Sequence, residues 1–352
     1  MVKIPGIITT VATAIMMTLS SCTNPVFEYE GDCEVIYYLN FIYENNLKWA
    51  DAFPSEVNSV NVYAFDENGL FVREFSEVGA PLSVPGYSMR LDLNPGNYTL
   101  VGWCGLVNDI VTEESFSVTT PIAGETTLDE LTCNLNTLFN SERGEYSDSR
   151  IHFLFHGNIN VELPDTQDGQ HYFYTMPLTK DTNHIRITLQ QIGEDLTDKD
   201  FDLSIIAPNG KMAYNNDIIG NTPINYLAWN IESDIIGIDG DDEGTRSTDY
   251  LGVIADLSTC RMMASQQKDC FLSVTHFDGE SSSEIFRVPF IQFALSAKQY
   301  YEKGYGRTMT DQEFLDRQDE YSMTFFLDED MKWMYAEIKV LSWRVVIHNY
   351  EI

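Results

Sequence analysis

Residues 57–75, VNSVNVYAFDENGLFVREF, decide the fold class. The run at 57–65 is rich in β-branched and aromatic side chains, which favour strands. Asp66-Glu67-Asn68-Gly69 supplies a turn, because Asp and Asn bond their own backbone and Gly accepts positive φ. LFVREF at 70–75 then returns as the second arm. The stretch therefore predicts an antiparallel β-hairpin.

The same pattern of short strands and turns recurs along the chain. From Cys33 to Tyr43 the apolar side chains alternate with polar ones, and Asn94-Pro95-Gly96-Asn97 predicts a type II turn. No alternation of strands with long helices is visible, which argues against parallel α/β folds. The pattern predicts an all-β protein built as sandwiches. Further strands are expected at 89–93, 98–104, 151–157, 183–192, 250–257, 270–274 and 285–295.

A polar segment at 158–170 divides the chain into two similar halves. We expect an N-terminal β-sandwich at 33–165 and a C-terminal β-sandwich at 166–352, since 331 residues after the N-terminal segment suit two domains. One short helix is expected in the second half, where Thr310 and Glu313 have the spacing of a capping box; it would run to about Tyr321.

The C-terminal residues 336–352, AEIKVLSWRVVIHNYEI, are again β-rich. Ile338 and Val340 lie on one face, but the alternation changes phase after them, which predicts a bulge. Beyond the phase change, the apolar residues of the other face are Leu341, Trp343, Val345 and Ile347.

The N-terminus has the features of a secretory signal. An apolar run begins near Ile4 and ends in Leu19-Ser20-Ser21-Cys22, which resembles a bacterial lipobox. That resemblance implies a lipoprotein signal peptide at 1–21, acylation of Cys22 as the first mature residue, and a tether at 22–32. The alternative is an ordinary signal with a chance cysteine. A membrane-spanning helix is disfavoured by Pro5, Gly6 and four threonines.

The formal net charge is −33, and it becomes −34 once residues 1–21, with Lys3 as their one charge, are removed. Such a surface repels phosphate backbones and anionic headgroups, so nucleic acid is excluded as a partner. The acids are spread along the chain, with DGDDEG at 239–244 as the densest cluster. We interpret the acidity chiefly as solubility outside the cell.

Five cysteines follow Cys22, so at most two disulfides form and one thiol remains. Cys33 and Cys104 both fall on apolar strand faces of the first half, and we expect them to pair. Cys260 and Cys270 flank a possible hairpin and are a second expected pair. The partner of Cys133 stays open.

Three sets of residues are candidate chemical sites, and none is favoured. His152 and His156 have strand spacing but lack a third metal ligand. The run at 239–244 imitates only the start of a calcium loop. Asp165 and Asp168 could pair as the two carboxylates of a glycosidase, but any acidic chain contains such pairs. No nucleophile elbow, phosphate loop or HExxH occurs. We expect no enzymatic activity, no metal and no cofactor.

Several stretches together carry a resemblance to a known family. They are the lipobox, Cys33, 49–72 (WADAFPSEVNSVNVYAFDENGLFV), 94–105 (NPGNYTLVGWCG), 176–189 (MPLTKDTNHIRITL) and 313–328 (EFLDRQDEYSMTFFLD), before a Trp-bearing terminal strand. In this combination the chain resembles the FimB-like minor fimbrial subunits, the lipoprotein anchors of type V pili. This resemblance implies two transthyretin-like β-sandwich domains in tandem, with one or two short helices in the second. It also implies a non-enzymatic outer-membrane lipoprotein that anchors the fimbrium, limits its length and binds the shaft subunit.

Basic residues near the tether bear on the type of subunit. In the family, a protease removes the first strand of shaft subunits. Between Cys22 and Arg73 this chain has no arginine and only Lys48 as a basic residue, so an arginine-specific protease has no site there. Retention of the tether fits an anchor. The alternatives are a tip adhesin, a glycan-binding surface lipoprotein or a shaft subunit.

The anchor hypothesis needs a contact with the shaft, made by strand exchange or edge pairing. Residues 336–352 are the expected segment, with Leu341, Trp343, Val345 and Ile347 as partner-strand candidates. The alternative is an ordinary closing strand of the second sandwich.

Overall fold

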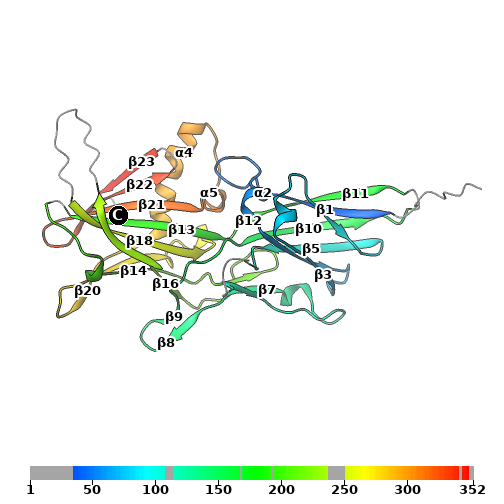
Figure 1. The fold of residues 1–352 in the computed structure, drawn as a ribbon, viewed down its shortest axis with the longest axis horizontal. Helices are drawn as coiled ribbons and strands as arrows, with labels where there is room; N and C mark the ends of the chain where they lie inside the picture. The colour runs from blue at the N-terminus through cyan, green and yellow to red at the C-terminus, as the bar shows by residue number, and fades with distance from the viewer. Residues whose placement is uncertain are drawn as a thin grey trace, which may run out of the picture. The chain divides into compact units, whose positions relative to one another are not determined.

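The computed structural model describes residues 35–107, 114–166, 169–191, 193–236, 250–340 and 343–348. The chain divides into two units: Tyr37–Asp165 with Phe173–Ile352 is one, and Met1–Ile36 with Thr166–Tyr172 is the other. The described helices and strands belong to the first unit, apart from one end each of Ile36–Ile42 (β1) and His171–Pro177 (β11). The structure confirms the all-β class and the tandem sandwiches (Figure 1).

The hairpin predicted at 57–75 forms the edge of the largest sheet of the first sandwich. Ser59–Phe65 (β2) pairs antiparallel with Phe71–Val78 (β3), and Gly69 in the turn has a φ of 73°. Asp66 accepts bonds from the amides of Asn68 and Leu70, which fixes the turn. The order of the five-stranded sheet is Thr179–Lys180 (β12), Phe155–Leu163 (β10), Gly96–Cys104 (β5), β2 and β3.

Two further sheets have three strands each. In the first, alternation along the central strand is as predicted, since Tyr37, Leu39 and Phe41 are buried. Its order is β11, β1 and Ser88–Leu91 (β4). The order of the other is Lys211–Ala213 (β15), Thr132–Leu135 (β7) and Phe116–Val118 (β6).

The second sandwich consists of two six-stranded sheets. Figure 1 shows β18, β13, β21, β22 and β23 of one of them side by side. The order of this sheet is Asn230–Ile236 (β17), Tyr250–Cys260 (β18), Thr182–Gln191 (β13), Glu320–Leu327 (β21), Trp333–Val340 (β22) and Trp343–His348 (β23). The order of the other is Ser282–Pro289 (β20), Phe271–Phe277 (β19), Phe201–Ala207 (β14), Ile224–Leu227 (β16), Gly144–Ser147 (β9) and Leu138–Asn140 (β8).

Strands pair across position 165. β7 pairs with β15, β9 pairs with β16, and a single cluster of buried apolar side chains contains members of both halves. The strand β10 also runs to Leu163, into the segment expected to be a polar linker, because Val161 and Leu163 are buried against the first sandwich. The exact domain boundary stays a prediction.

The helices are short: Phe53–Glu56 (α2), Phe290–Ser296 (α3), Lys298–Tyr305 (α4) and Asp311–Arg317 (α5). The single strand predicted at 285–295 is wrong, because β20 ends at Pro289 and α3 begins there. Proline cannot donate to a continuing ladder. Phe290, Ile291, Phe293 and Ala294 are buried and Gln292 is exposed, but a run of seven residues is too short for the sequence to distinguish a helix from a buried strand.

The predicted helix after Thr310 is α5, although it ends at Arg317 rather than near Tyr321. Only one of the two hydrogen bonds of a capping box forms. The Thr310 side chain accepts the Glu313 amide at 3.1 Å, whereas the Glu313 carboxylate accepts from Arg317 Nε at 3.0 Å.

This cap gives the first prediction. Thr310→Ala leaves an amide of the first helical turn without its acceptor, and we expect it to lower the free energy of unfolding by about 1 kcal/mol. Thr308→Ala is the matched control, since Thr308 is exposed just before the cap, and its effect should stay within about 0.5 kcal/mol. Urea unfolding of both variants measures the difference. Equal effects of the two changes would contradict the cap.

The C-terminal phase change is a chain reversal, and the predicted bulge is wrong. β22 and β23 pair antiparallel, with Val340 opposite Trp343 and Ile338 opposite Val345. Apolar residues on either side of a reversal face the same core although their numbering changes phase.

Candidate functional site

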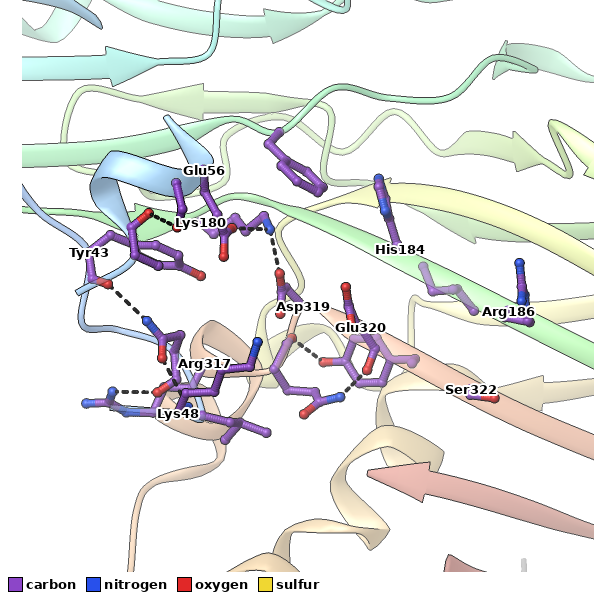
Figure 2. Close-up of a pocket in the computed structure, with 18 of the residues that line it drawn as sticks. Tyr43, Lys48, Glu56, Lys180, His184, Arg186, Arg317, Asp319, Glu320 and Ser322 are labelled. Carbon is purple, nitrogen blue, oxygen red and sulfur yellow. Dashed lines mark hydrogen bonds and ion pairs between the residues drawn. The ribbon is translucent and has the colours of Figure 1, made fainter. Parts of the chain in front are cut away.

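A cleft of about 1090 Å³ lies on the outer face of the six-stranded sheet that contains β13. This sheet has β17 at one edge and β23 at the other and is called the β17–β23 sheet below. Its floor follows from the alternation in β13, where Ile185 and Ile187 point into the core and His184 and Arg186 therefore point outward. Its other walls come from the segment after β1, from α2, from the residues around 150–153 and from the end of α5 (Figure 2).

Lys180 lies at the inner wall, with a side chain only 3% exposed. Figure 2 shows its ammonium between two carboxylates: Nζ is 2.9 Å from Glu56 Oε2 and 2.6 Å from Asp319 Oδ2. The same Nζ lies 3.4 Å from the ring centroid of Phe153. A buried cation needs such partners, so Lys180 ties α2 to the segment after α5 and organises the wall.

Arg186 and Asp256 form a second ion pair on the floor. Arg186 Nε donates to Asp256 Oδ1 at 2.7 Å and Nη2 donates to Oδ2 at 3.1 Å, while Asn230 Nδ2 adds a third bond at 3.1 Å. Partial burial acts against ionisation, yet the bonds from Arg186 and Asn230 hold the pKa of Asp256 below its ordinary value. The Arg186 side chain remains 57% exposed.

Arg317 holds the segment after β1 in place. Its Nη1 donates to the Glu44 carbonyl at 3.0 Å, its Nε donates to Glu313, and its Cζ lies 3.5 Å from the centroid of the Trp49 ring. Trp49 has a φ of 55° and donates from Nε1 to the Tyr301 hydroxyl at 2.8 Å. This side of the cleft is therefore fixed by side chains far apart in the sequence.

His184 also faces the cleft, and its ring lies 4.9 Å from that of Phe153. Burial, helped by the charge of Arg150, lowers the pKa of His184. The lowered pKa favours the neutral imidazole, in a wall where Lys180, Arg186 and Arg317 each have an acidic partner. The walls of the cleft therefore consist largely of charged and hydrogen-bonding side chains.

Little in the sequence indicates this cleft. The polar positions His184 and Arg186 follow from the alternation at 183–192, but no sequence pattern joins them to Lys48, Arg150 or Arg317. The segment after β1, β13 and α5 meet only through tertiary packing.

The predicted disulfides are not present among the described residues. Cys104, Cys133, Cys260 and Cys270 are buried free thiols, while Cys22 and Cys33 lie outside the described residues. The Cys33–Cys104 pairing thus stays a prediction. Burial raises the pKa of the Cys260 and Cys270 thiols to about 12.

The expected hairpin between Cys260 and Cys270 is wrong. Cys260 ends β18 in one sheet, and Cys270 precedes β19 in the opposite sheet. The chain crosses from one layer to the other between them, so the two cysteines do not face each other as hairpin neighbours do.

The partner-strand candidates fall on β23 and beside it. Val345 is 4% exposed and Ile347 packs against the core, whereas Leu341 lies outside the described residues. Trp343 begins β23. The segment thus has the closing position in the sheet order, with β22 as its paired neighbour.

The three candidate chemical sites gain no support. His156 in β10 donates from Nε2 to the Tyr214 carbonyl at 2.8 Å, and His152 precedes that strand. Asp165 is exposed, while Asp168 and residues 239–244 lie outside the described residues. Within the described ranges, no group of three or more His, Cys, Asp or Glu side chains is placed to hold a metal.

In the part of the chain that the structure describes, no helix is both long and apolar enough to cross a bilayer.

Comparisons with known proteins agree with this architecture. Residues 29–349 match the family described as fimbrillin-A associated anchor proteins Mfa1 and Mfa2. The minor fimbrium anchoring subunit Mfa2 of Porphyromonas gingivalis is 23% identical over 298 residues, covering 80% of this chain and 78% of that protein.

Two solved structures are similar. A candidate adhesin of Bacteroides thetaiotaomicron is 30% identical with a TM-score of 0.74, covering 89% of this chain and 97% of its own. The structure of the fimbrial anchor protein Mfa2 of P. gingivalis, at 19% identity and a TM-score of 0.61, covers 89% of this chain and 99% of its own and shares the fold.

Proposed function

Because the chain belongs to the family of the fimbrillin-A associated anchor proteins Mfa1 and Mfa2, we propose that it is an outer-membrane lipoprotein that anchors a fimbrium and limits its length. It acts without catalysis, by holding the shaft subunit at the base of the fibre. The match over residues 29–349 carries this proposal, since it spans nearly all of the chain that would follow the tether.

The membrane attachment is proposed to be an acyl modification of Cys22. The apolar run that ends in Leu19-Ser20-Ser21-Cys22 supports it. Two acyl chains anchor stably where one does not. The absence of arginine between Cys22 and Arg73 supports retention of this attachment, since an arginine-specific protease has no site there.

The shaft is proposed to bind by edge pairing at β23. Trp343–His348 ends the order of its sheet, and main-chain groups at a sheet edge pair with an added strand. Because β23 already pairs with β22, addition of a partner strand to it fits better than donation of β23 to the partner.

The second prediction tests the attachment. In Cys22→Ala the acyl chains are lost, so we expect nearly all of the protein to leave the membrane fraction and fimbriae to be shed into the medium. Cell fractionation with an alkaline wash and electron microscopy measure the two results.

Cys33→Ala is the matched control, since it removes a nearby cysteine that does not follow the lipobox. It should leave the protein with the membrane. Quantitative membrane association of Cys22→Ala after the wash would contradict the acyl anchor. Attached fimbriae of normal length in a gene deletion would contradict the anchor function itself.

A tip adhesin is the second candidate, because a relative 30% identical to this chain is described as a candidate adhesin. Immunogold labelling separates the two. Gold at the cell-proximal end of the fimbria supports the anchor, and gold at the free end supports the adhesin.

A further inference from the structure

The cleft on the β17–β23 sheet concentrates basic residues in a chain that has few of them. The sequence contains 21 Lys and Arg against 54 Asp and Glu. Six of those 21 line this cleft, with five acids. The basic residues are Lys48, Arg150, Lys180, Arg186, Arg317 and Lys339, and the acids are Asp51, Glu56, Asp256, Asp319 and Glu320.

Three of these cations have no acidic partner within the described ranges. Lys180, Arg186 and Arg317 each pair with an acid, as described above. Lys48, Arg150 and Lys339 are exposed, and no ion pair to the described residues involves them. They come from the segment after β1, from the segment before β10 and from β22, so three separate parts of the chain bring them to one cleft.

The acids of the cleft offset the charge of its cations only in part. Glu56, Asp256 and Asp319 are engaged by Lys180 and Arg186. Asp51 accepts the amides of Tyr43 and Phe53 at 2.9 and 3.0 Å. Glu320 alone among the lining acids bonds no described group through its carboxylate. Six cations against five acids therefore leave the lining with a net charge of +1, on a protein whose formal net charge is −33.

The aromatic faces of the cleft are already in use. The centroid of the Phe153 ring lies 3.4 Å from the Lys180 ammonium and 4.9 Å from the centroid of the His184 ring. Arg150 Cζ lies 5.5 Å from the centroid of the Trp229 ring, and the Trp229 indole donates to Ser258. Sugars are held largely by stacking on open aromatic faces, so the chemistry of the cleft favours carboxylates over sugar rings.

We propose that this cleft binds an acidic segment of a partner protein, whose carboxylates pair with Lys48, Arg150 and Lys339. At about 1090 Å³ the cleft exceeds a typical small-molecule pocket and accepts a peptide of several residues. Lysine and arginine near a partly enclosed surface attract such a segment and orient it. The identification of the partner as a fimbrial subunit rests on the proposed function, whereas binding of the acidic segment does not.

The test uses the full purified protein in detergent and N-acetylated hexaglutamate as the probe. Isothermal titration compares the unmodified protein with the triple variant Lys48→Gln, Arg150→Gln, Lys339→Gln. Each exposed charge pair contributes about 0.2–1 kcal/mol, so the triple variant should bind between about threefold and about 150-fold more weakly. All three side chains are exposed, and the unfolding curve should not move.

A matched triple variant removes the same charge elsewhere. Lys211, Lys268 and Lys303 are exposed and lie outside the cleft, and their replacement by Gln should change hexaglutamate affinity less than about twofold. Hexagalacturonate, with the same number of carboxylates on sugar rings, distinguishes a glycan. If the cleft triple fails to fold, Arg150→Gln alone provides the comparison.

Three results would overturn the proposal: no binding of hexaglutamate by the unmodified protein, equal losses in both triples, or preference for hexagalacturonate. The anchor function is tested separately, by whether cells that carry Cys22→Ala retain their fimbriae. A cleft that binds hexaglutamate in a protein that does not retain fimbriae would keep this inference and reject the anchor.

Discussion

Replacing Val345 by Asn is expected to lower the free energy of unfolding by about 3–5 kcal/mol. Val345 lies in β23 with 4% of its surface exposed, opposite the fully buried Ile338 of β22. The substitution loses the burial of an apolar side chain and places an amide without partners in the core of the second sandwich. An effect of this size removes a large part of the stability of a typical domain.

The neighbouring residue provides a matched control. Val346 belongs to the same strand but is 41% exposed, because successive strand residues face opposite sides. Val346→Asn changes the same β propensity without touching the core, and we expect less than about 1 kcal/mol. Urea unfolding of both variants measures the ratio.

The same pair separates a closing strand from a donated one. A closing strand makes Val345→Asn destabilising before any partner is present. The opposite outcome is that Val345→Asn unfolds like the unmodified protein while cells that carry it lose their fimbriae. That outcome would indicate that β23 is donated to the partner and does not close its own sheet. Attached fimbriae in Val346→Asn cells would indicate that this outward side chain is not needed for edge pairing.

Asp181 should make the stability of the protein depend on pH. The residue lies between β12 and β13 and is fully buried. Burial raises the pKa of its carboxyl to about 7, although Arg261 at 3.9 Å and the amide of Asn216 at 2.8 Å act in the opposite direction; Asp316 raises it further. Its Oδ2 bonds no described group.

The direction of the effect follows from proton linkage. An aspartate in the unfolded chain releases its proton near pH 4, whereas folded Asp181 keeps its proton to about pH 7. The contribution to stability is therefore fully present below about pH 4 and is lost as the pH rises to about 7. Asp181→Asn removes this loss, so the free energy of unfolding of the variant relative to the unmodified protein should rise by about 4 kcal/mol between pH 4 and pH 8.

Chemical unfolding at a series of pH values measures this difference, and Asp269→Asn is the control, since Asp269 is exposed. His156→Gln is the counterpart of opposite sign. Burial lowers the pKa of His156 to about 4, despite its bond to Tyr214, so His156 costs stability as the pH falls from about 6.5 to 4. A stability difference for Asp181→Asn that does not change with pH would contradict a proton held on this carboxyl.

Local patterns in the sequence predict most of the strands. The hairpin at 57–75 forms because its side chains and its Asp-Glu-Asn-Gly turn each favour the same structure. The alternation at Tyr37, Leu39 and Phe41, and the helix cap at Thr310, are confirmed for the same reason: each depends on residues only a few positions apart.

The failures occur where the environment, rather than the local pattern, selects the structure. α3 has only seven residues, and a short, largely apolar run is as compatible with a buried strand as with a helix. The reversal between β22 and β23 has the same phase change as a bulge. Cys260 and Cys270 are only ten residues apart, yet they lie in opposite layers.

By itself, the sequence determined the all-β class and the excess of acidic residues, while the lipid attachment at Cys22 stays a prediction from it. These depend on composition and on short-range periodicity, which the chain has before it folds. The tertiary structure alone decided that Lys48, Arg150 and Lys339 meet in one cleft and that Asp181 lies fully buried. The physical reason is that ion pairing and desolvation depend on distance and burial, which only the packed sheets define.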